Sequence, residues 1–442
     1  MKKICKVLVI SSTLFSAAAY SQNAPQATLY QNVRIFDGVS DKLTAPMNVL
    51  IAGNKIKSVS SSPIPVPKDS EVFVINGNGR TLMPGLIDAH VHLTFSGVTP
   101  EELMGPGASP ALIQKKAAEQ AQLMLMRGFT TARDMAGPVL QVKADIDSGK
   151  AIGPRIYPSG AIISQTSGHG DISPPDALPY SLGGPVPPGN LIRASIIADG
   201  RPQVLAAARF NLRQGASQIK MAASGGVSSD HDPSWVTEYT PDELRAGVEA
   251  ATNFGTYVTV HAYTPESVRN SVNAGVKVIE HGQNLDEATV KYLADKNIWL
   301  STQILEESTD PPLDLAKLDL VTANQSNVWK WALKHKVKLA WGTDRVMIPQ
   351  NMYLENADIV KLRQWMTPAR ALKMVTHDNA ELCALSGRRN PYPGKLGVVQ
   401  EGAYADLLLV DGDPIANFDI IADPNKNFRV IMKDGKIYKN TL

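Results

Sequence analysis

The sequence contains little cysteine and no excess of charge of one sign. Only Cys5 and Cys383 are cysteines among 442 residues, and 44 Lys and Arg nearly balance 42 Asp and Glu, for a net charge of +2. A near-neutral chain without a basic stripe gives us no reason to expect nucleic acid or an anionic membrane surface as a partner. Glycine (33) and proline (30) are not enriched, and 43% of the residues are hydrophobic. This composition excludes collagenous and disordered proteins and is ample for a packed core.

The first 21 residues have the pattern of a secretory signal peptide. Lysines at positions 2, 3 and 6 precede an apolar stretch over residues 7–15, and Ala19-Tyr20-Ser21 is a small-x-small cleavage site. The apolar stretch is too short to span a bilayer. We therefore expect export across the inner membrane, most simply to a bacterial periplasm, with no membrane contact after signal removal. Cys5 leaves with the signal, and Cys383 alone cannot close an intramolecular disulfide.

Both ends of the remaining chain have short strand-like segments separated by turn signals. Examples are the Asp37-Gly38 turn near the amino end and the Asp434-Gly435 turn near the carboxyl end. Neither end is long enough for a core of its own. We expect residues 22–82 and 386–442 to complete one small β-sandwich domain together.

The middle of the chain, residues 83–385, alternates short apolar runs with longer helical stretches. Thr-Pro pairs mark helix starts at Thr99, Thr240, Thr264 and Thr367, where the Thr caps the helix and the Pro takes its first position. Eight apolar runs are candidate strands: residues 86–91, 129–133, 155–159, 218–222, 257–261, 277–280, 298–302 and 338–341. Eight strand–helix units predict an α/β fold, a TIM-like (β/α)₈ barrel, in which chemistry collects at the carboxyl ends of the strands.

One insertion interrupts this rhythm. Residues 168–201 are rich in Gly and Pro and follow the third candidate strand. A loop of this length in a compact barrel either covers the active site or is a solvated excursion without a role, and the sequence favours neither.

Four of the eight histidines fall at the ends of candidate strands. His90 and His92 are two residues apart, so on an extended strand both imidazoles point to the same side and can bind one metal ion. His261 ends the fifth strand and His281 follows the sixth. Core packing is the better explanation of the His90/His92 pair by itself, but the place of all four histidines at one end of a barrel favours a metal site.

Asp344 and Lys220 add two further groups at that end. Asp344 follows the eighth strand, beside the first once the barrel closes, where its carboxylate either binds metal and handles protons or caps a helix. Alternation turns Ile219 and Met221 toward the helices and Lys220 into the barrel. A buried ammonium must be paired or chemically changed. Reaction of this amine with carbon dioxide would give a carbamate, a carboxylate able to bridge two metals.

These segments together resemble the amidohydrolase superfamily of binuclear metal hydrolases, over residues 27–442. The resemblance is carried by Lys220, His261 and the stretches PGLIDAHVH (84–92), EHG (280–282), GTD (342–344), GAYADL (402–407) and DGDP (411–414). It implies a barrel with a split terminal sandwich. It also implies that His90, His92 and Asp344 hold one divalent ion, that His261 and His281 hold a second, and that the Lys220 carbamate bridges the two. Zinc is the expected metal for a nitrogen-rich site, with manganese or cobalt as alternatives.

Shorter stretches are similar to one branch of the superfamily, the Xaa-Pro dipeptidases and ochratoxin-type amidases. They are GFTTARD (128–134), SGHGD (167–171) and MAASGG (221–226). This likeness implies hydrolysis of an amide bond to an L-amino acid with a free carboxylate, as in dipeptides, N-acyl amino acids or ochratoxin-like amides. A metal-bridging hydroxide would attack the carbonyl, with Asp344 as proton shuttle and His281 among the catalytic residues.

Three further residues are candidates for substrate contact. His169, in a glycine-flanked loop, either stabilises the oxyanion or holds the substrate carboxylate, or else it is a loop histidine hydrogen-bonded to Asp171. Arg345 offers a bidentate partner for a free α-carboxylate, or only supports its neighbours. His231 follows the fourth strand and lines the pocket or lies in solvent.

Two other functions share these features. A cyclic amide or imide hydrolase of the dihydropyrimidinase or hydantoinase kind uses the same metal core, and only the shorter stretches argue against it. A barrel can also survive as a binding protein after losing catalysis, and the complete ligand set argues against that. The expected partner is a small amide substrate, and homo-oligomerisation is left open.

Overall fold

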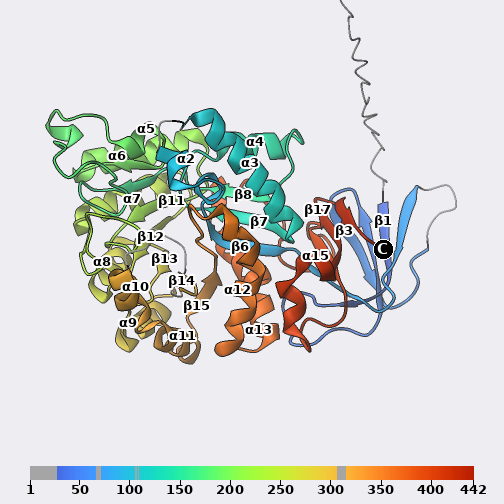
Figure 1. Ribbon diagram of the computed structural model, residues 1–442. Helices are drawn as coiled ribbons and strands as arrows, with labels where there is room; N and C mark the ends of the chain where they lie inside the picture. The colour runs from blue at the N-terminus through green and yellow to red at the C-terminus, as the bar shows by residue number, and fades with distance from the viewer. Residues whose placement is uncertain (1–26, 66–70, 105–106, 108, 306–314) are drawn as a thin grey trace, which may run out of the picture.

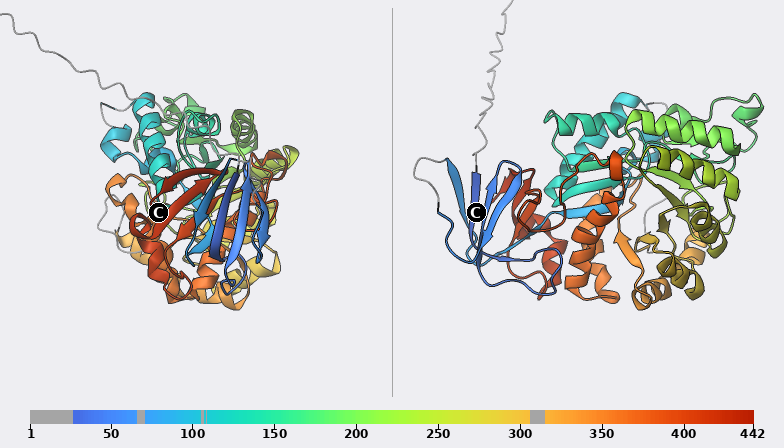
Figure 2. Two further views of the ribbon diagram at one scale, coloured as in Figure 1. Left: turned by 90° about the vertical axis from the view of Figure 1, so that its right-hand side faces the viewer. Right: turned by 180° about the vertical axis from the view of Figure 1, so that it is seen from behind.

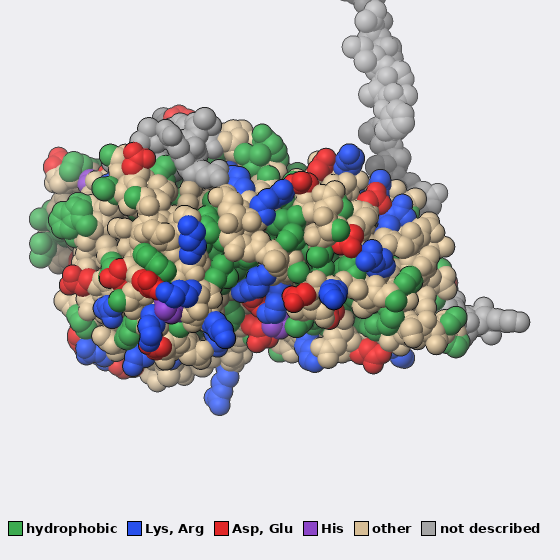
Figure 3. Space-filling model, turned by 90° about the horizontal axis from the view of Figure 1, so that it is seen from below, with side chains coloured by type: hydrophobic (Ala, Val, Ile, Leu, Met, Phe, Trp, Pro, Cys, Tyr) green, Lys and Arg blue, Asp and Glu red, His purple; other side chains and the backbone are tan. Residues whose placement is uncertain are grey.

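The computed structural model describes residues 27–65, 71–104, 107, 109–305 and 315–442 (Figure 1). The predicted signal peptide lies outside these residues. A larger α/β body and a smaller β-rich body lie side by side. The face drawn in Figure 3 mixes acidic with basic side chains. Among the described helices, none is long and apolar enough to cross a membrane.

All eight strands expected for the barrel are present, each within one residue of its predicted bounds. They are β6 (Leu86–Val91), β7 (Phe129–Asp134), β8 (Arg155–Pro158), β11 (Ile219–Ala222), β12 (Val258–Ala262), β13 (Val278–His281), β14 (Trp299–Thr302) and β15 (Lys338–Trp341). They run parallel and in sequence order, as the sheet segments β6-β7-β8 and β11-β12-β13-β14-β15. Two short strands, β9 (Ile162–Ser164) and β10 (Ser195–Ile197), extend the second segment beyond β11.

Buried side-chain amides join the two sheet segments where ladder bonds are missing. Between β8 and β11, Gln218 Nε2 donates to the Tyr157 carbonyl at 2.9 Å. Between β15 and β6, Asn379 Nδ2 donates to the carbonyls of Ile87 at 2.6 Å and Trp341 at 2.8 Å. Backbone groups at both seams are thereby satisfied away from water, and the barrel closes.

Helices cover the outside of the barrel (Figure 1). The longer ones are α3 (Pro110–Met126), α4 (Leu140–Asp147), α6 (Gly200–Gln214), α7 (Pro241–Asn253), α8 (Pro265–Ala274), α9 (Glu287–Asp295), α10 (Leu315–Thr322), α11 (Gln325–Lys334) and α12 (Glu355–Lys361). Shorter helices are α1 (Leu93–Ser96), α2 (Pro100–Met104), α5 (Pro188–Leu191), α13 (Pro368–Lys373) and α14 (Asn379–Ala384), and α15 (Pro424–Asn427) lies beside β17 (Phe428–Lys433) in the carboxyl-terminal part. The predicted caps are confirmed: Thr240 forms a capping box with Glu243, and the Thr264 and Thr367 hydroxyls accept from the first turns of α8 and α13.

The predicted alternation along β11 is confirmed. Ile219 and Met221 belong to the apolar layer between strands and helices. A Cβ placed on Gly247 of α7 would lie 2.3 Å from Met221 Sδ, so α7 packs directly on this strand. Lys220 points the other way, into the barrel, and is only 2% exposed.

The two chain ends form one β-rich body, as expected (Figure 2). Its strands are β1 (Ala27–Ile35), β2 (Met47–Ala52), β3 (Lys55–Ser60), β4 (Val72–Asn76), β5 (Thr81–Pro84), β16 (Leu407–Val410), β17 (Phe428–Lys433) and β18 (Lys436–Asn440). β1 pairs with β2 and β4 along its first half and with β5 near its end, and β16 pairs with β5. A separate apolar core contains Tyr30 and Val49 from one end and Leu407 and Met432 from the other. The exact domain boundaries, 82/83 and 385/386, stay a prediction.

Part of the 168–201 insertion forms secondary structure that joins the barrel sheet. It holds the 3₁₀ turn Tyr180–Leu182, α5 and β10, and β10 pairs in parallel with β9. Leu178, Tyr180 and Leu182 are exposed. Both alternatives for this loop, lid and solvated excursion, stay predictions.

Candidate metal centre

The predicted ligands converge at the carboxyl ends of the barrel strands. Asp344 Oδ1 lies 3.1 Å from His92 Nε2 and 3.4 Å from His90 Nε2. One ligand atom from each of these three residues lies within 4.8 Å of the others, the arrangement that a single cation needs. His281 Nδ1 is 3.5 Å from the second oxygen of Asp344, and the His281 and His261 ring centroids are 4.3 Å apart. His90, His92 and His281 therefore surround one carboxylate, and His261 of β12 lies beside His281.

Two of these residues have a strained backbone. His281 has a φ of +73° and Asp344 a φ of +52°, in the left-handed region that costs a non-glycine residue roughly 1–2 kcal/mol. Glu280, one residue before His281, points into the barrel, so regular alternation would turn the His281 ring outward. The left-handed backbone at His281 instead directs its imidazole toward the metal centre. Such strain is typical of functional positions.

The imidazole nitrogens are arranged to bind cations. His90 Nε2 and His92 Nδ1 are buried and have no hydrogen-bond partner among the described residues. His281 Nδ1 contacts Gln303 Oε1 at 3.0 Å, which leaves its Nε2 for a ligand role. His261 contacts the Gly225 carbonyl through Nε2 at 3.1 Å, which leaves Nδ1. The unpartnered His90 Nε2 faces the Asp344 carboxylate, a pairing of donor atoms that fits a divalent metal.

The protonation states suit the same role. Burial lowers the pKa of His90 to about 4 and holds the pKa values of His261 and His281 well below the usual range, so these rings are neutral near pH 7. Burial alone would raise the pKa of Asp344, but the facing imidazoles of His90 and His281 and a hydrogen bond from His92 hold it well below its usual range. Neutral imidazoles and an ionised carboxylate are the forms that bind metal.

Lys220 lies at the floor of this cluster. Burial lowers the pKa of its ammonium to about 8, although the carboxylates of Glu280 and Asp344 oppose the shift. The uncharged amine, the form that reacts with carbon dioxide, is therefore more populated at neutral pH than in an ordinary lysine.

Buried acidic residues behind the ligands were missed by the sequence analysis. Asp88 accepts from the His90 backbone N–H at 2.9 Å and from the Thr343 hydroxyl at 2.7 Å, which ties β6 to the Asp344 turn. Glu280 Oε2 lies 2.9 Å from His90 Nδ1. The available signal was alternation, because Asp88 and His90 share one face of their strand.

His169 lies against the predicted ligand His261. The two rings are nearly parallel, with centroids 3.8 Å apart. His169 Nδ1 contacts Ser229 Oγ at 3.0 Å and Asp232 Oδ2 at 3.4 Å. The alternative of a hydrogen bond to Asp171 is wrong, because that carboxylate accepts from backbone N–H groups of its own loop instead. His169 is thus placed at the edge of the centre.

Arg345 and His231 have protein partners. Arg345 donates to Asp358 Oδ2 through Nε at 3.0 Å and Nη2 at 2.6 Å. His231 Nε2 contacts the Ser173 carbonyl at 2.8 Å and lines a cavity of about 480 Å³ with the 168–201 insertion. These contacts use neither Arg345 Nη1 nor His231 Nδ1, and the substrate roles of both residues stay predictions.

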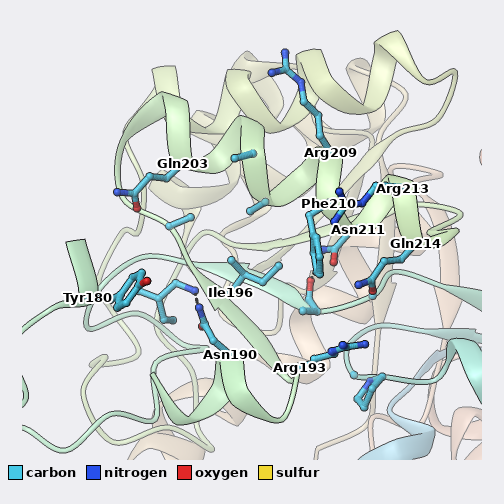
Figure 4. A pocket seen from close by; sticks show the side chains of 18 of the residues that line it. Tyr180, Asn190, Arg193, Ile196, Gln203, Arg209, Phe210, Asn211, Arg213 and Gln214 are labelled. Carbon is cyan, nitrogen blue, oxygen red and sulfur yellow. Dashed lines mark hydrogen bonds between the residues drawn. The ribbon is translucent and has the colours of Figure 1, made fainter. Parts of the chain in front are cut away.

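A second cavity lies away from the metal ligands. It measures about 830 Å³ and lies between α6 and the segment 180–197 (Figure 4). Phe210 and Ile196 line its middle, with Arg193 and Arg213 at one end. None of the predicted ligands lines it, so it is separate from the candidate centre.

Comparison with known proteins decides the family. A model described as the amidohydrolase family matches residues 81–439. The chain belongs to the amidohydrolase family. Ochratoxinase from Aspergillus niger is 32% identical over 376 residues, which cover 81% of this chain and 75% of that protein. Two solved structures each match 94% of this chain and 100% of their own: an amidohydrolase (32% identity, TM-score 0.85) and a prolidase complexed with N-methylphosphonate-L-proline (29%, 0.84).

Membership in the amidohydrolase family confirms several predictions. The resemblance to the superfamily, and to its ochratoxinase and prolidase branches, is confirmed, as is the barrel with a terminal β-rich domain. The protein is a metal-binding hydrolase that acts on amide or peptide bonds.

Proposed function

We propose that this amidohydrolase hydrolyses the amide bond to an L-amino acid that carries a free carboxylate. Dipeptides, N-acyl amino acids and ochratoxin-like amides are the substrate classes. The observation that carries the proposal is the convergence of His90, His92, His261, His281 and Asp344 around one barrel mouth above Lys220. The names of the ochratoxinase and prolidase relatives support the substrate class.

The residues divide into two metal subsites. His90, His92 and Asp344 would hold one divalent ion, and His261 and His281 would hold the second. Carbon dioxide would add to the uncharged Lys220 amine with loss of one proton, and the resulting carbamate would offer a carboxylate to both subsites. Zinc suits this nitrogen-rich donor set.

Asp344 would move the proton during hydrolysis. Two bound divalent ions supply an acidified water as nucleophile and polarise the amide carbonyl. Asp344 is the carboxylate within 3.5 Å of three histidine ligands, and it is ionised because those imidazoles face it. It would accept the proton of the attacking water and pass it to the leaving nitrogen, which departs as a neutral amine.

His169 would contact the substrate. Its Nδ1 is occupied by Ser229 and Asp232, so Nε2 is the nitrogen that can donate to an oxyanion or to the substrate carboxylate. Its stacking on His261 keeps that donor beside the second metal subsite.

We also propose export to the periplasm. The proposal depends on the lysines, apolar stretch and small-x-small site of residues 1–21. Amino-terminal sequencing of the protein recovered from a periplasmic fraction tests it, with a mature chain beginning near residue 22 as the expected result.

Metal analysis with a substrate panel tests the function. Purified protein is analysed for metal and then assayed on dipeptides, N-acyl amino acids and cyclic amides. We expect two ions per chain and turnover only of linear amides with a free carboxylate. Turnover of cyclic amides alone would indicate the hydantoinase-like function instead. If the metal-replete protein is inactive on the whole panel, a binding protein is favoured.

A further inference from the structure

A chain of buried, hydrogen-bonded side chains runs from the interior of the barrel to the first metal subsite. It consists of Arg133 on β7, Glu280 on β13 and His90 on β6. We infer that Glu280, held by Arg133, is a positioning residue that orients the His90 imidazole for metal binding. This inference rests on the metal centre of the proposed function.

The contact between Glu280 and His90 defines which ring nitrogen is free. Glu280 Oε2 lies 2.9 Å from His90 Nδ1, and the two side chains are 0% and 1% exposed. An ionised carboxylate only accepts hydrogen bonds, so Nδ1 carries the hydrogen. The lone pair is then on Nε2, which faces Asp344 at 3.4 Å and is the nitrogen without a hydrogen-bond partner in the described part of the chain. Carboxylate contacts of this kind orient metal-binding histidines and increase their basicity.

Arg133 makes the buried carboxylate tolerable and fixes its position. Its Nη2 lies 2.5 Å from Glu280 Oε1, and both side chains are 0% exposed. Without a cation, a carboxylate at this depth would be strongly disfavoured. Arg133 Nε also donates to the Ala89 carbonyl at 2.6 Å, and Nη1 donates to the Tyr257 hydroxyl at 3.2 Å. One guanidinium therefore holds both the carboxylate and the backbone that precedes His90.

A second donor completes the arrangement. The Thr259 hydroxyl on β12 donates to Glu280 Oε1. Both carboxylate oxygens are thus occupied, Oε1 by Arg133 and Thr259 and Oε2 by His90. Because both of its oxygens have partners, the Glu280 carboxylate has one orientation relative to the His90 imidazole. A carboxylate that only neutralised Arg133 would not need this fixed orientation.

A matched ion pair elsewhere in the chain serves as control. Arg155 donates to Asp406 through Nε at 2.8 Å and Nη2 at 3.2 Å, and the two side chains are 6% and 4% exposed. This pair joins the barrel to the terminal domain and touches none of the six predicted ligands. Its loss should affect stability but not metal binding.

The experiment compares metal retention in Glu280→Gln and Asp406→Asn. Each protein is loaded with Zn²⁺ in the presence of bicarbonate and titrated with a chelator, and the bound metal is counted. We expect Glu280→Gln to hold one of its two ions about 10- to 100-fold more weakly than the wild type, and Asp406→Asn to hold both as tightly as the wild type. In Co²⁺-loaded protein, the visible spectrum of only the first variant should change.

A double variant guards against misfolding. Glu280→Gln leaves Arg133 without its charge partner, so Arg133→Met combined with Glu280→Gln removes both charges together. This double variant should fold and should still bind one of its two metal ions more weakly than the wild type.

Three outcomes are distinguished. Wild-type retention of both ions in folded Glu280→Gln and in the double variant would overturn the inference, as would an equal loss in Asp406→Asn. A wild-type protein that binds no metal would instead defeat the proposed function. Normal metal binding without turnover of any amide would defeat the proposed substrate class and leave the role of Glu280 intact.

Discussion

The imidazoles of His169 and His261 stack at a centroid distance of 3.8 Å, although one comes from the loop after β9 and the other ends β12. Ser229 and Asp232, from a third segment of the chain, contact His169 Nδ1. These contacts determine the direction in which the other ring nitrogen, Nε2, points. This relationship places a hydrogen-bond donor beside the metal subsite formed by His261 and His281.

Replacement of His169 by Asn should therefore impair turnover and spare metal binding. Asn is too short to bring its amide donor to the position of His169 Nε2, and the loss of this contact with the developing oxyanion predicts a decrease in kcat of about 10²-fold. The measurement is steady-state kinetics together with elemental analysis. His335→Asn is the matched control, because His335 pairs with Glu287 away from the predicted ligands and should leave kcat unchanged. Loss of metal from His169→Asn would contradict a substrate-facing role.

Asp344→Asn should leave metal largely bound while turnover is lost. The amide oxygen can still face the histidines, but it cannot accept the proton of the attacking water, so we expect kcat to fall about 10²- to 10⁴-fold. Elemental analysis and single-turnover kinetics on the same sample are the measurements. A near-native rate in a metal-replete variant would exclude Asp344 as the proton shuttle.

Metal binding should depend on carbon dioxide through Lys220. Metal-stripped protein reloaded with Zn²⁺ in bicarbonate should bind two ions, whereas reloading in carbon dioxide-free buffer should leave the centre incomplete. Lys220→Met keeps a similar volume but has no amine, so bicarbonate should not change its metal content. If the wild type binds two ions equally well in both buffers, the carbamate bridge is wrong.

Glu238 should make folding stability decrease with pH. This buried carboxyl accepts from the His169 backbone N–H at 2.8 Å, and burial raises its pKa to about 9. Between about pH 4.3, the pKa of Glu238 in the unfolded chain, and about pH 9, the folded protein binds one more proton than the unfolded chain. The free energy of unfolding therefore decreases as pH rises through this range. Glu238→Gln keeps an acceptor and cannot ionise.

Urea denaturation of both proteins measures the effect. The stability of Glu238→Gln relative to the wild type should increase between about pH 5 and pH 8. A difference that is constant over this range would show that Glu238 has an ordinary pKa in the folded protein.

Asp406→Asn should loosen the contact between barrel and terminal domain. Asp406 is almost fully buried, accepts two hydrogen bonds from Arg155 and one from the Asp434 backbone, and is the buried one of the two carboxylates that balance the guanidinium. Breaking a buried ion pair costs about 3–5 kcal/mol, which should appear as a lower thermal midpoint with metal content unchanged. An unchanged midpoint would mean that Asp434, which also contacts Arg155, is a sufficient partner.

The sequence alone was enough for the features that depend on near neighbours. Alternation along a strand placed Lys220 inside the barrel and put His90 and His92 on one side of β6, while the Thr-Pro pairs marked helix starts such as Thr240. These features need only the geometry of the local backbone, which a few consecutive residues determine.

Tertiary structure alone decided which distant groups share a buried environment. Glu280 and His90 are 190 positions apart, and no local pattern relates them. Likewise, Asp171 looked like the partner of His169 because it is near in sequence, but Asp232 and Ser229 occupy that position, and Arg345 is paired with Asp358. Such partners are selected when barrel closure removes water from several strands at once, because each buried charge must then find its counterpart wherever the fold brings one.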